Sequence, residues 1–170
     1  MTQRRPTLVI GTKSWSSWSL RPWLLMRQMG LEFDEIVVQL RSPQTGEMIA
    51  RHSPSGKVPV LIDGDFIVWD SLAIAEYLAD LHPELAIWPR ERHARAVARA
   101  VSGEMHAGFQ ALRQNCPMDV NATGLVPADP GVISADVRRI VKDAKDKANR
   151  PVLYQPGMAP KAAMPPPAKP

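Results

Sequence analysis

The stretch Val58-Pro59-Val60-Leu61-Ile62-Asp63-Gly64-Asp65-Phe66-Ile67-Val68-Trp69 decides the fold expected for this chain. It holds two apolar runs, residues 58–62 and 66–69, on either side of Asp-Gly, and this dipeptide between apolar runs is a strong signal for a β-hairpin. Pro59 lies at the head of the first run, where proline is tolerated in a strand and where a cis peptide bond after Val58 is plausible. The sequence therefore predicts an antiparallel pair of strands that begins at a proline.

The residues before the hairpin predict a β-α-β unit. Residues 7–11 are a short apolar strand candidate, residues 20–29 carry Leu, Met and Trp at helical spacing, and residues 33–40 include a β-branched run. Ser19 is the expected N-cap of the helix, because a serine side chain accepts hydrogen bonds from free N–H groups. Gly30 is its expected end, because glycine adopts positive φ readily.

The segment after the hairpin predicts a closing helix. From Ser71 the apolar residues recur every three or four positions up to Leu81, which is the pattern of a helix with one buried face. The whole order, β-α-β followed by β-β-α, is that of an α/β thioredoxin-like N-terminal domain with a mixed four-stranded sheet.

The second half of the chain predicts an incomplete all-α C-terminal domain. Apolar residues at helical spacing predict one long helix over residues 90–114 and a second over residues 134–148, with Ser134 as its N-cap. Beyond residue 149 a proline-rich stretch shows no such period. The expected divisions are a domain over 1–82, a proline-bounded linker over 83–89, a partial helical domain over 90–149 and an irregular tail over 150–170.

Composition limits the partners expected for this chain. Of its 170 residues, 45% are hydrophobic and 22% are charged, the proportions of an ordinary globular protein with a core. The formal charge of +4 comes from Lys and Arg interleaved with Asp and Glu, so no nucleic acid partner is expected. No window reaches the roughly 20 apolar residues of a membrane span, and the N-terminus lacks a secretory pattern. No membrane partner is expected either.

A single cysteine, Cys116, limits the redox and metal chemistry. It excludes an internal disulfide, a Cys-x-x-Cys redox pair and a thiolate metal cluster. A reducing, cytoplasmic location fits this count, and no metal is expected. A redox oxidoreductase is a poor hypothesis, because no cysteine lies near the first predicted helix.

Three segments carry residues suited to binding a small peptide. The run Ser14–Ser19 places hydroxyls where the first strand passes into the first helix, and the free N–H groups of a helix start favour an anion or a thiolate. Asp70 and Ser71 begin the closing helix, where they could hold the ammonium and carboxylate of an amino acid, or simply cap the helix. A cis bond before Pro59 would turn the backbone of Val58 toward an extended peptide. An edge-strand proline without a ligand is the alternative.

These segments together resemble the cytosolic glutathione transferases, most closely the zeta-like, serine-dependent branch related to maleylacetoacetate isomerases. The motifs are Ser16–Arg21, Val58-Pro59 and Asp70-Ser71, in that order, and the resemblance extends over residues 7–115. It implies glutathione as co-substrate and Ser16 as the catalytic hydroxyl that stabilises the glutathione thiolate. It also implies further glutathione contacts at Ser14, Ser17, Arg21, Gln44, Val58, Pro59, Asp70, Ser71 and Gln110.

The resemblance also implies a second substrate and a second copy of the chain. A small hydrophobic electrophile would lie between the N-terminal domain and the long helix, where Met105, Phe109 and Arg113 are the expected contacts. Members of the family usually form symmetric homodimers. His106 lies on the same helix, but without an evident Ser or Cys partner it is expected to be a core or surface residue.

The leading hypothesis is a glutathione transferase in which Ser16 activates the thiol for attack on the electrophile. The first alternative is a glutathione-dependent cis–trans isomerase of an unsaturated acid, although Trp18 stands where those isomerases have a cysteine. The second alternative is a non-catalytic thioredoxin-like module that binds glutathione or a protein. Assays of conjugation, of cis–trans conversion and of glutathione binding would separate the three.

Overall fold

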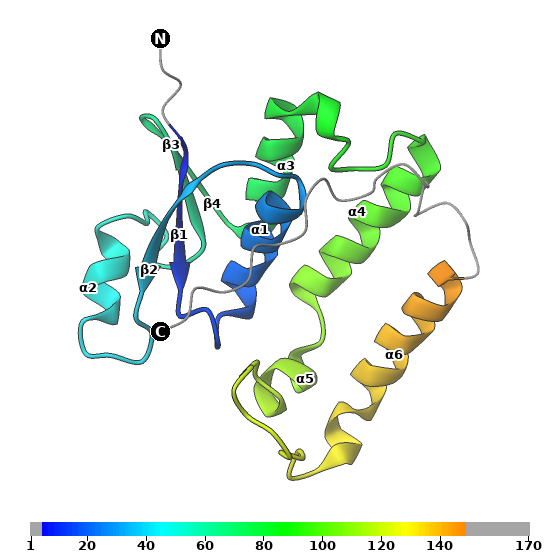
Figure 1. Ribbon diagram of the computed structural model, residues 1–170. Coiled ribbons are helices and arrows are strands. Elements are labelled where there is room, and N and C mark those ends of the chain that lie inside the picture. Colours follow the sequence, from blue (N-terminus) through cyan, green and yellow to red (C-terminus); the bar gives the residue numbers. More distant parts are fainter. Residues whose placement is uncertain (1–4, 149–170) are drawn as a thin grey trace.

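The computed structural model describes residues 5–148. In this part of the chain a four-stranded sheet is flanked by helices, and a further group of helices follows beside it (Figure 1). The irregular tail expected over 150–170 lies outside the described residues, as do the first four residues. None of the helices between residues 5 and 148 has the length and apolar run that a membrane span requires.

The N-terminal half has the predicted order of elements with one helix added. Its elements are β1 (Thr7–Gly11), α1 (Ser17–Gln28), β2 (Asp34–Val38), α2 (Thr45–Ala50), β3 (Val60–Asp63), β4 (Phe66–Trp69) and α3 (Ser71–Leu81). The strands lie in the order β2-β1-β3-β4. β1 is parallel to β2 and antiparallel to β3, and β3 is antiparallel to β4. The predicted thioredoxin-like mixed sheet is confirmed.

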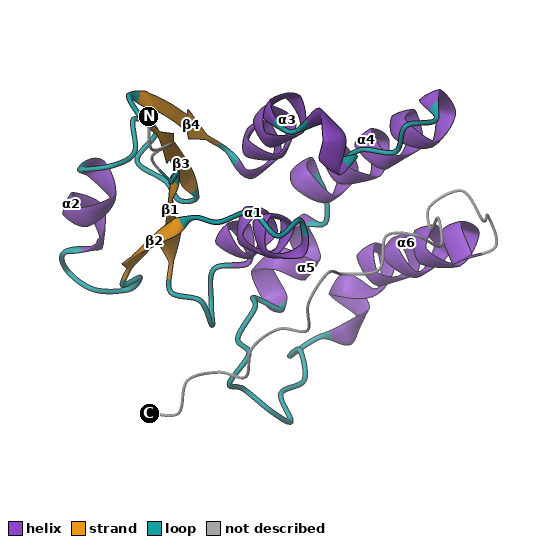
Figure 2. Cartoon of the chain, turned by 45° about the horizontal axis from the view of Figure 1, so that its top comes forward, coloured by secondary structure: helices purple, strands orange, loops and turns teal. Residues whose placement is uncertain are grey.

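Alternation along β1 divides the core between the two faces of the sheet. Leu8 belongs to one buried cluster with Met26 of α1 and Ile74 of α3. Its neighbour Val9 belongs to another cluster with Ile49 of α2. Because successive strand side chains point to opposite faces, α1 and α3 cover one face of the sheet and α2 covers the other (Figure 2).

The proline-led hairpin is also confirmed. The Val58-Pro59 peptide bond is cis, and Gly64 has a φ of 61° in the turn between β3 and β4. α2 was not predicted from the sequence, because its 6 residues are too few to show a helical period.

The first helix begins earlier than predicted. α1 starts at Ser17, and Ser16 is its N-cap because the Ser16 side chain accepts the N–H of Ser19. The prediction of Ser19 as N-cap is therefore wrong. The first turn, with its serines and tryptophan, carries no apolar period that would reveal it. Gly30 follows the last turn with a φ of 69°, as predicted.

The C-terminal half contains one helix more than predicted within the described residues. Its elements are the 3-10 turn η1 (Pro83–Leu85) in the expected linker, α4 (Arg92–Ala107), α5 (Gln110–Asn115) and α6 (Pro130–Ala148). The single long helix over 90–114 is wrong, because the chain breaks at Gly108, which is extended, and at Phe109, which has a φ of 61°. The guanidinium of Arg113 donates to the carbonyls of Met105 and Gly108, which a continuing helix would have used.

α6 begins four residues before the predicted N-cap, at Pro130 rather than Ser134. Proline is favoured at the first position of a helix, and the Asp129 carboxylate accepts the N–H of Gly131 at 2.8 Å. Ser134 lies inside the helix, where its hydroxyl donates to the carbonyl of Gly131.

Candidate functional site

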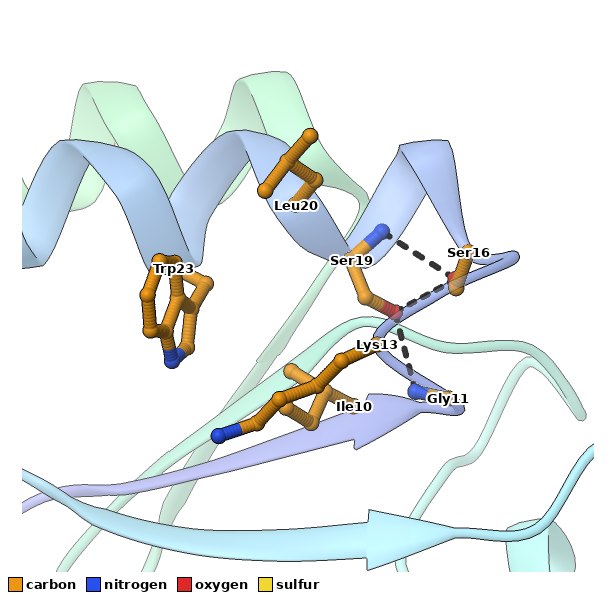
Figure 3. A pocket seen from close by; sticks show the side chains of 7 residues that line it. All are labelled: Ile10, Gly11, Lys13, Ser16, Ser19, Leu20 and Trp23. Atoms are coloured by element: carbon orange, nitrogen blue, oxygen red, sulfur yellow. Dashed lines mark hydrogen bonds between the residues drawn. The ribbon is translucent and has the colours of Figure 1, made fainter. Parts of the chain in front are cut away.

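Ser16 lies where β1 passes into α1, and its hydroxyl is held inside the protein (Figure 3). Its Oγ donates to Ser19 Oγ at 2.8 Å and accepts the Ser19 N–H at 3.3 Å. Ser19 Oγ in turn accepts the N–H of Gly11, the last residue of β1, at 3.0 Å. Ser16 is only 7% exposed. The Ser16 hydroxyl would therefore have to leave Ser19 before it could donate to a ligand.

Neighbouring groups at the start of α1 are free of protein partners. Within residues 5–148, the hydroxyls of Ser14 and Ser17 and the N–H of Trp18 make no hydrogen bond. All three residues are partly buried. The free N–H groups of a helix start carry partial positive charge. A thiolate placed here could be stabilised without disturbing the Ser16–Ser19 pair.

A small cavity of about 90 Å³ opens beside this junction. It is lined by Ile10, Gly11, Lys13, Ser16, Ser19, Leu20 and Trp23 (Figure 3). Next to it, Glu35 of β2 accepts the Trp23 Nε1–H at 2.8 Å and pairs with Lys13 and Arg27. Burial alone raises the pKa of Glu35, but the hydrogen bonds from Lys13, Trp23 and Arg27 outweigh it and the net shift is downward. These polar groups satisfy one another and tie α1 to β2.

The loop before β3 and the start of α3 present the other predicted glutathione contacts. Within the described residues, the backbone N–H and C=O of Val58 make no hydrogen bond, and Pro59 beside it is buried. Asp70 is the N-cap of α3, with Oδ1 accepting the N–H of Leu72 at 2.8 Å. Ser71 is 5% exposed, and its hydroxyl has no partner among residues 5–148.

Two arginines stack on Trp18. The guanidinium carbon of Arg21 lies 4.1 Å from the centroid of the Trp18 ring, and that of Arg113 lies 4.9 Å from it. Neither arginine is paired with a carboxylate in the described part of the chain. Burial lowers the pKa of Arg21, and the charge of Arg113 lowers it further, while Asp70 partly offsets both. The negative charge near Arg21 therefore does not balance the positive charge of the two guanidinium groups.

His106 of α4, expected from the sequence to be a core or surface residue, completes this cluster. Its Nε2 lies 3.2 Å from Asp70 Oδ2. Its ring meets the Trp18 ring edge-on, with centroids 5.1 Å apart. Only the packing of α4 against α3 brings residues 70 and 106 together, and no pattern in the sequence relates them. The prediction that His106 is an uninvolved core or surface residue missed its carboxylate partner.

A cavity of about 440 Å³ lies between α1, α3 and α4. It brings together three of the predicted site residues, Arg21, Ser71 and Met105, and His106 also lines it. Most of its other lining residues are apolar: Pro22, Leu25, Leu72, Ala75, Ile87 and Val101. A cavity of this size, mainly apolar with a few polar groups, is typical of a small-molecule site.

The remaining predicted residues do not line this cavity. Gln44 is exposed at the start of α2, where its side chain bonds with Ser42. Gln110 is exposed at the start of α5 and donates to a carbonyl of α4. Phe109 is partly buried between α4 and α5, and the Arg113 guanidinium donates to the carbonyls of Met105 in α4 and of Gly108 just after it. Their roles toward glutathione or an electrophile stay predictions. Within residues 5–148 no three His, Cys, Asp or Glu side chains are grouped as metal ligands.

Comparison with known sequences shows that part of the chain is similar to one protein family. Residues 15–81 match the family model for the glutathione S-transferase N-terminal domain. A probable maleylacetoacetate isomerase of Caenorhabditis elegans is 31% identical over 112 residues, which cover 66% of this chain and 51% of that protein. Glutathione S-transferase Z2 of Arabidopsis thaliana is 34% identical over 96 residues, covering 56% and 43%. The chain spans about half the length of the curated relatives it matches.

Comparison with solved structures extends the likeness to the C-terminal helices. A Burkholderia glutathione transferase homolog with bound glutathione has a TM-score of 0.55 and 29% identity, covering 65% of this chain and 58% of that chain. An unclassified glutathione S-transferase of Bombyx mori has a TM-score of 0.64, covering 84% of this chain and 68% of that chain. Its identity is 22%, so this likeness concerns the fold alone.

Proposed function

We propose that this chain, whose residues 15–81 match the glutathione S-transferase N-terminal domain, binds glutathione and joins its thiol sulfur to a small hydrophobic electrophile. The observation that carries the proposal is a set of backbone groups in residues 15–81 that have no hydrogen-bond partner within residues 5–148. They are the N–H and C=O of Val58 and, at the start of α1, the N–H of Trp18. An extended peptide pairs with such backbone groups, and a thiolate is stabilised by such a helix start.

In this proposal glutathione lies extended between α1 and α3. Its cysteinyl backbone pairs with Val58 beside Pro59, and its γ-glutamyl end reaches Asp70 and Ser71. Asp70 Oδ1 caps α3 and Oδ2 faces His106, so the glutathione ammonium would share this carboxylate with the imidazole. The free hydroxyl of Ser71 supports the placement of the γ-glutamyl carboxylate.

The serine hydroxyls at the start of α1 would lower the pKa of the bound thiol. A lowering of about two units requires about 2.7 kcal/mol, which exceeds the net worth of one neutral hydrogen bond. Ser16 is the first candidate for the hydroxyl donor, with Ser14 and Ser17 beside it. The N-terminus of α1 and the cation Arg21 would add to the hydroxyl's effect.

The test is conjugation of glutathione to a chromogenic aryl halide by the native protein and by Ser16→Ala. We expect kcat/KM to fall by about tenfold, the worth of one hydrogen bond, because the N-terminus of α1 and Arg21 supply the rest of the pKa shift. Ser19→Ala is the matched control, because it breaks the same hydroxyl pair and leaves Ser16 in place. Full activity in Ser16→Ala would remove Ser16 from the thiolate site. Loss in Ser17→Ala alone would move the role to Ser17.

The isomerase alternative has support of its own from the relatives named maleylacetoacetate isomerase in Caenorhabditis elegans and Dictyostelium discoideum. A direct assay of cis–trans conversion of an unsaturated acid in the presence of glutathione distinguishes it. Glutathione binding by calorimetry without any rate enhancement would instead indicate the non-catalytic module.

Assembly as a homodimer is part of the proposal. On β4, an edge strand of the sheet, Ile67 and Trp69 are 38% and 47% exposed, and the alternation of the strand places both side chains on the same face. Large apolar side chains gathered on one surface mark a contact site. Sedimentation should give the mass of two chains, and a monomer at micromolar concentration would contradict this. We also propose that residues 83–89 link the N-terminal domain to the helical domain. We propose a cytoplasmic location as well, with which the free, exposed Cys116 is consistent.

A further inference from the structure

The buried side-chain polar atoms that lack a partner within residues 5–148 gather at one cavity. They are Ser71 Oγ, Trp88 Nε1 and His106 Nδ1, and all three residues line the cavity of about 440 Å³ between α1, α3 and α4. Buried polar groups in native proteins are nearly always bonded to protein, water or ligand. Glutathione at Ser71 would satisfy one of the three atoms. The other two call for a second ligand.

The polar groups stand at the two ends of an apolar channel. α3 and α4 run antiparallel, since Asp70 meets His106 while Glu76 meets Arg99. The guanidinium of Arg99 lies 5.5 Å from the centroid of the Trp88 ring. Arg99 precedes His106 by two helical turns, which is about 10 Å along α4. Leu72, Ala75 and Val101 line the cavity as well, so its walls are suited to an apolar chain.

The His106 end favours an anion. Arg21 lines the cavity there, and both Arg21 and His106 contact the Trp18 ring. Within the described residues Arg21 is not paired with a carboxylate, and Asp70 is already engaged by α3 and His106. Because His106 Nε2 faces Asp70, Nδ1 is the ring nitrogen that remains for a ligand. The Trp88 end offers one neutral N–H donor and therefore favours an uncharged oxygen acceptor.

We propose that the cavity between α1, α3 and α4 binds a medium-chain aliphatic acid. Its carboxylate lies at Arg21 and His106, its chain follows the apolar walls, and an uncharged oxygen at its far end accepts the Trp88 N–H. The site is distinct from the groove proposed for glutathione and adjoins it at Ser71. Its occupation does not depend on glutathione.

Three probes of similar length test this assignment by calorimetry on the whole chain without glutathione. Monomethyl suberate has a carboxylate and an ester, decanoate has only the carboxylate, and dimethyl suberate has no charge. We expect one saturable site for monomethyl suberate, with both other probes bound about tenfold more weakly, since one hydrogen bond or screened charge contact is worth about 1.4 kcal/mol. Equal affinity for dimethyl suberate, or no saturable binding of any probe, would overturn the proposal.

Two variants locate the probe, with a matched control. Arg21→Gln should weaken monomethyl suberate about tenfold and leave dimethyl suberate unchanged. Trp88→Phe should abolish the advantage of monomethyl suberate over decanoate. Arg51→Gln changes an exposed arginine directly after α2 and should leave binding of all three probes unchanged. Circular dichroism confirms folding, and Trp88→Phe decides the matter if Arg21→Gln does not fold. Unchanged binding in both variants overturns the placement, whereas failure to bind glutathione bears only on the proposed transferase.

Discussion

Residues 5–81 and residues 92–148 are held together by different forces. In the part of the chain whose burial is described, every buried apolar residue except Ala94 lies at or before Leu78. The helices after residue 92 meet their neighbours through polar contacts, such as Arg99 with Glu76 and Arg139 with Glu104. The N-terminal half thus has a hydrophobic core of its own, and the C-terminal helices pack against its surface.

This difference matters for the cavity between the halves. α1 and α3 form its firm wall, because their side chains Met26, Ile74 and Leu78 belong to the main buried cluster. α4 forms the opposite wall and contributes only Ala94 to the buried apolar set of the described chain. Changes in the first half should therefore affect the free energy of unfolding far more than changes in the second half.

The largest effect should come from Ile74→Ala. This side chain is 0% exposed, at the centre of the cluster that joins β1, α1 and α3. Its truncation should lower the free energy of unfolding by about 2–5 kcal/mol, measured by urea titration. The matched control is Val137→Ala on α6, a side chain 40% exposed, which should change it by less than about 0.5 kcal/mol. Equal losses of unfolding free energy in the two variants would contradict the view that the core lies in the N-terminal half.

An intermediate effect should come from Glu35→Gln. The carboxylate is 16% exposed and holds Lys13 and Arg27 as well as Trp23, so its neutralisation should cost about 1–2 kcal/mol at neutral pH after solvent screening of the exposed cations. The folded state lowers the pKa of Glu35, so its contribution is present above the ordinary carboxyl pKa and disappears as pH falls through the lowered value.

Urea titrations of both proteins at neutral and at acidic pH check this sign. The gap between native protein and Glu35→Gln should close in acid, and a gap that widens there would contradict the assignment. Glu32→Gln serves as control, because Glu32 is 73% exposed and pairs only with the exposed Arg5 among the described residues.

The smallest effect should come from Arg99→Gln, which removes the Arg99–Glu76 pair between α4 and α3. Both side chains are partly exposed, at 49% and 36%, and ion pairs open to solvent contribute little and are screened by salt. We expect a slight fall in the urea midpoint that vanishes in about 1 M salt. A double-mutant cycle with Glu76→Gln isolates the pair. A loss as large as that of Ile74→Ala would show that α4 is essential to the core.

Local chemistry made the N-terminal half predictable. The Asp-Gly turn, the proline at the head of the hairpin and the period of α3 each involve residues close in sequence, and all are confirmed. The long helix over 90–114 failed because its break depends on Phe109 at positive φ and on Arg113 turning back to α4. The spacing of apolar residues predicts neither the backbone conformation of Phe109 nor the direction of the Arg113 side chain.

For the candidate site, too, the local motifs could be predicted from the sequence, whereas the contacts between distant segments could not. Its motifs at Ser16, Val58 and Asp70 follow from local features and from the family resemblance. That Ser16 is bonded to Ser19 could not be inferred, because the direction of a hydroxyl depends on packing between β1 and α1. Nor could the approach of His106 to Asp70, since it depends on how α4 packs against α3.

The sequence by itself determined the mixed sheet, the cis-proline hairpin and the order of the binding motifs, because turns, alternation and helix periods act over a few residues. Only the tertiary structure decided which polar groups are satisfied and which are left free. It paired Glu35 with residues of α1 and left Ser71 Oγ, Trp88 Nε1 and His106 Nδ1, within residues 5–148, without hydrogen-bond partners around one cavity. The reason is that burial and hydrogen bonding between distant segments are set by the packing of whole helices.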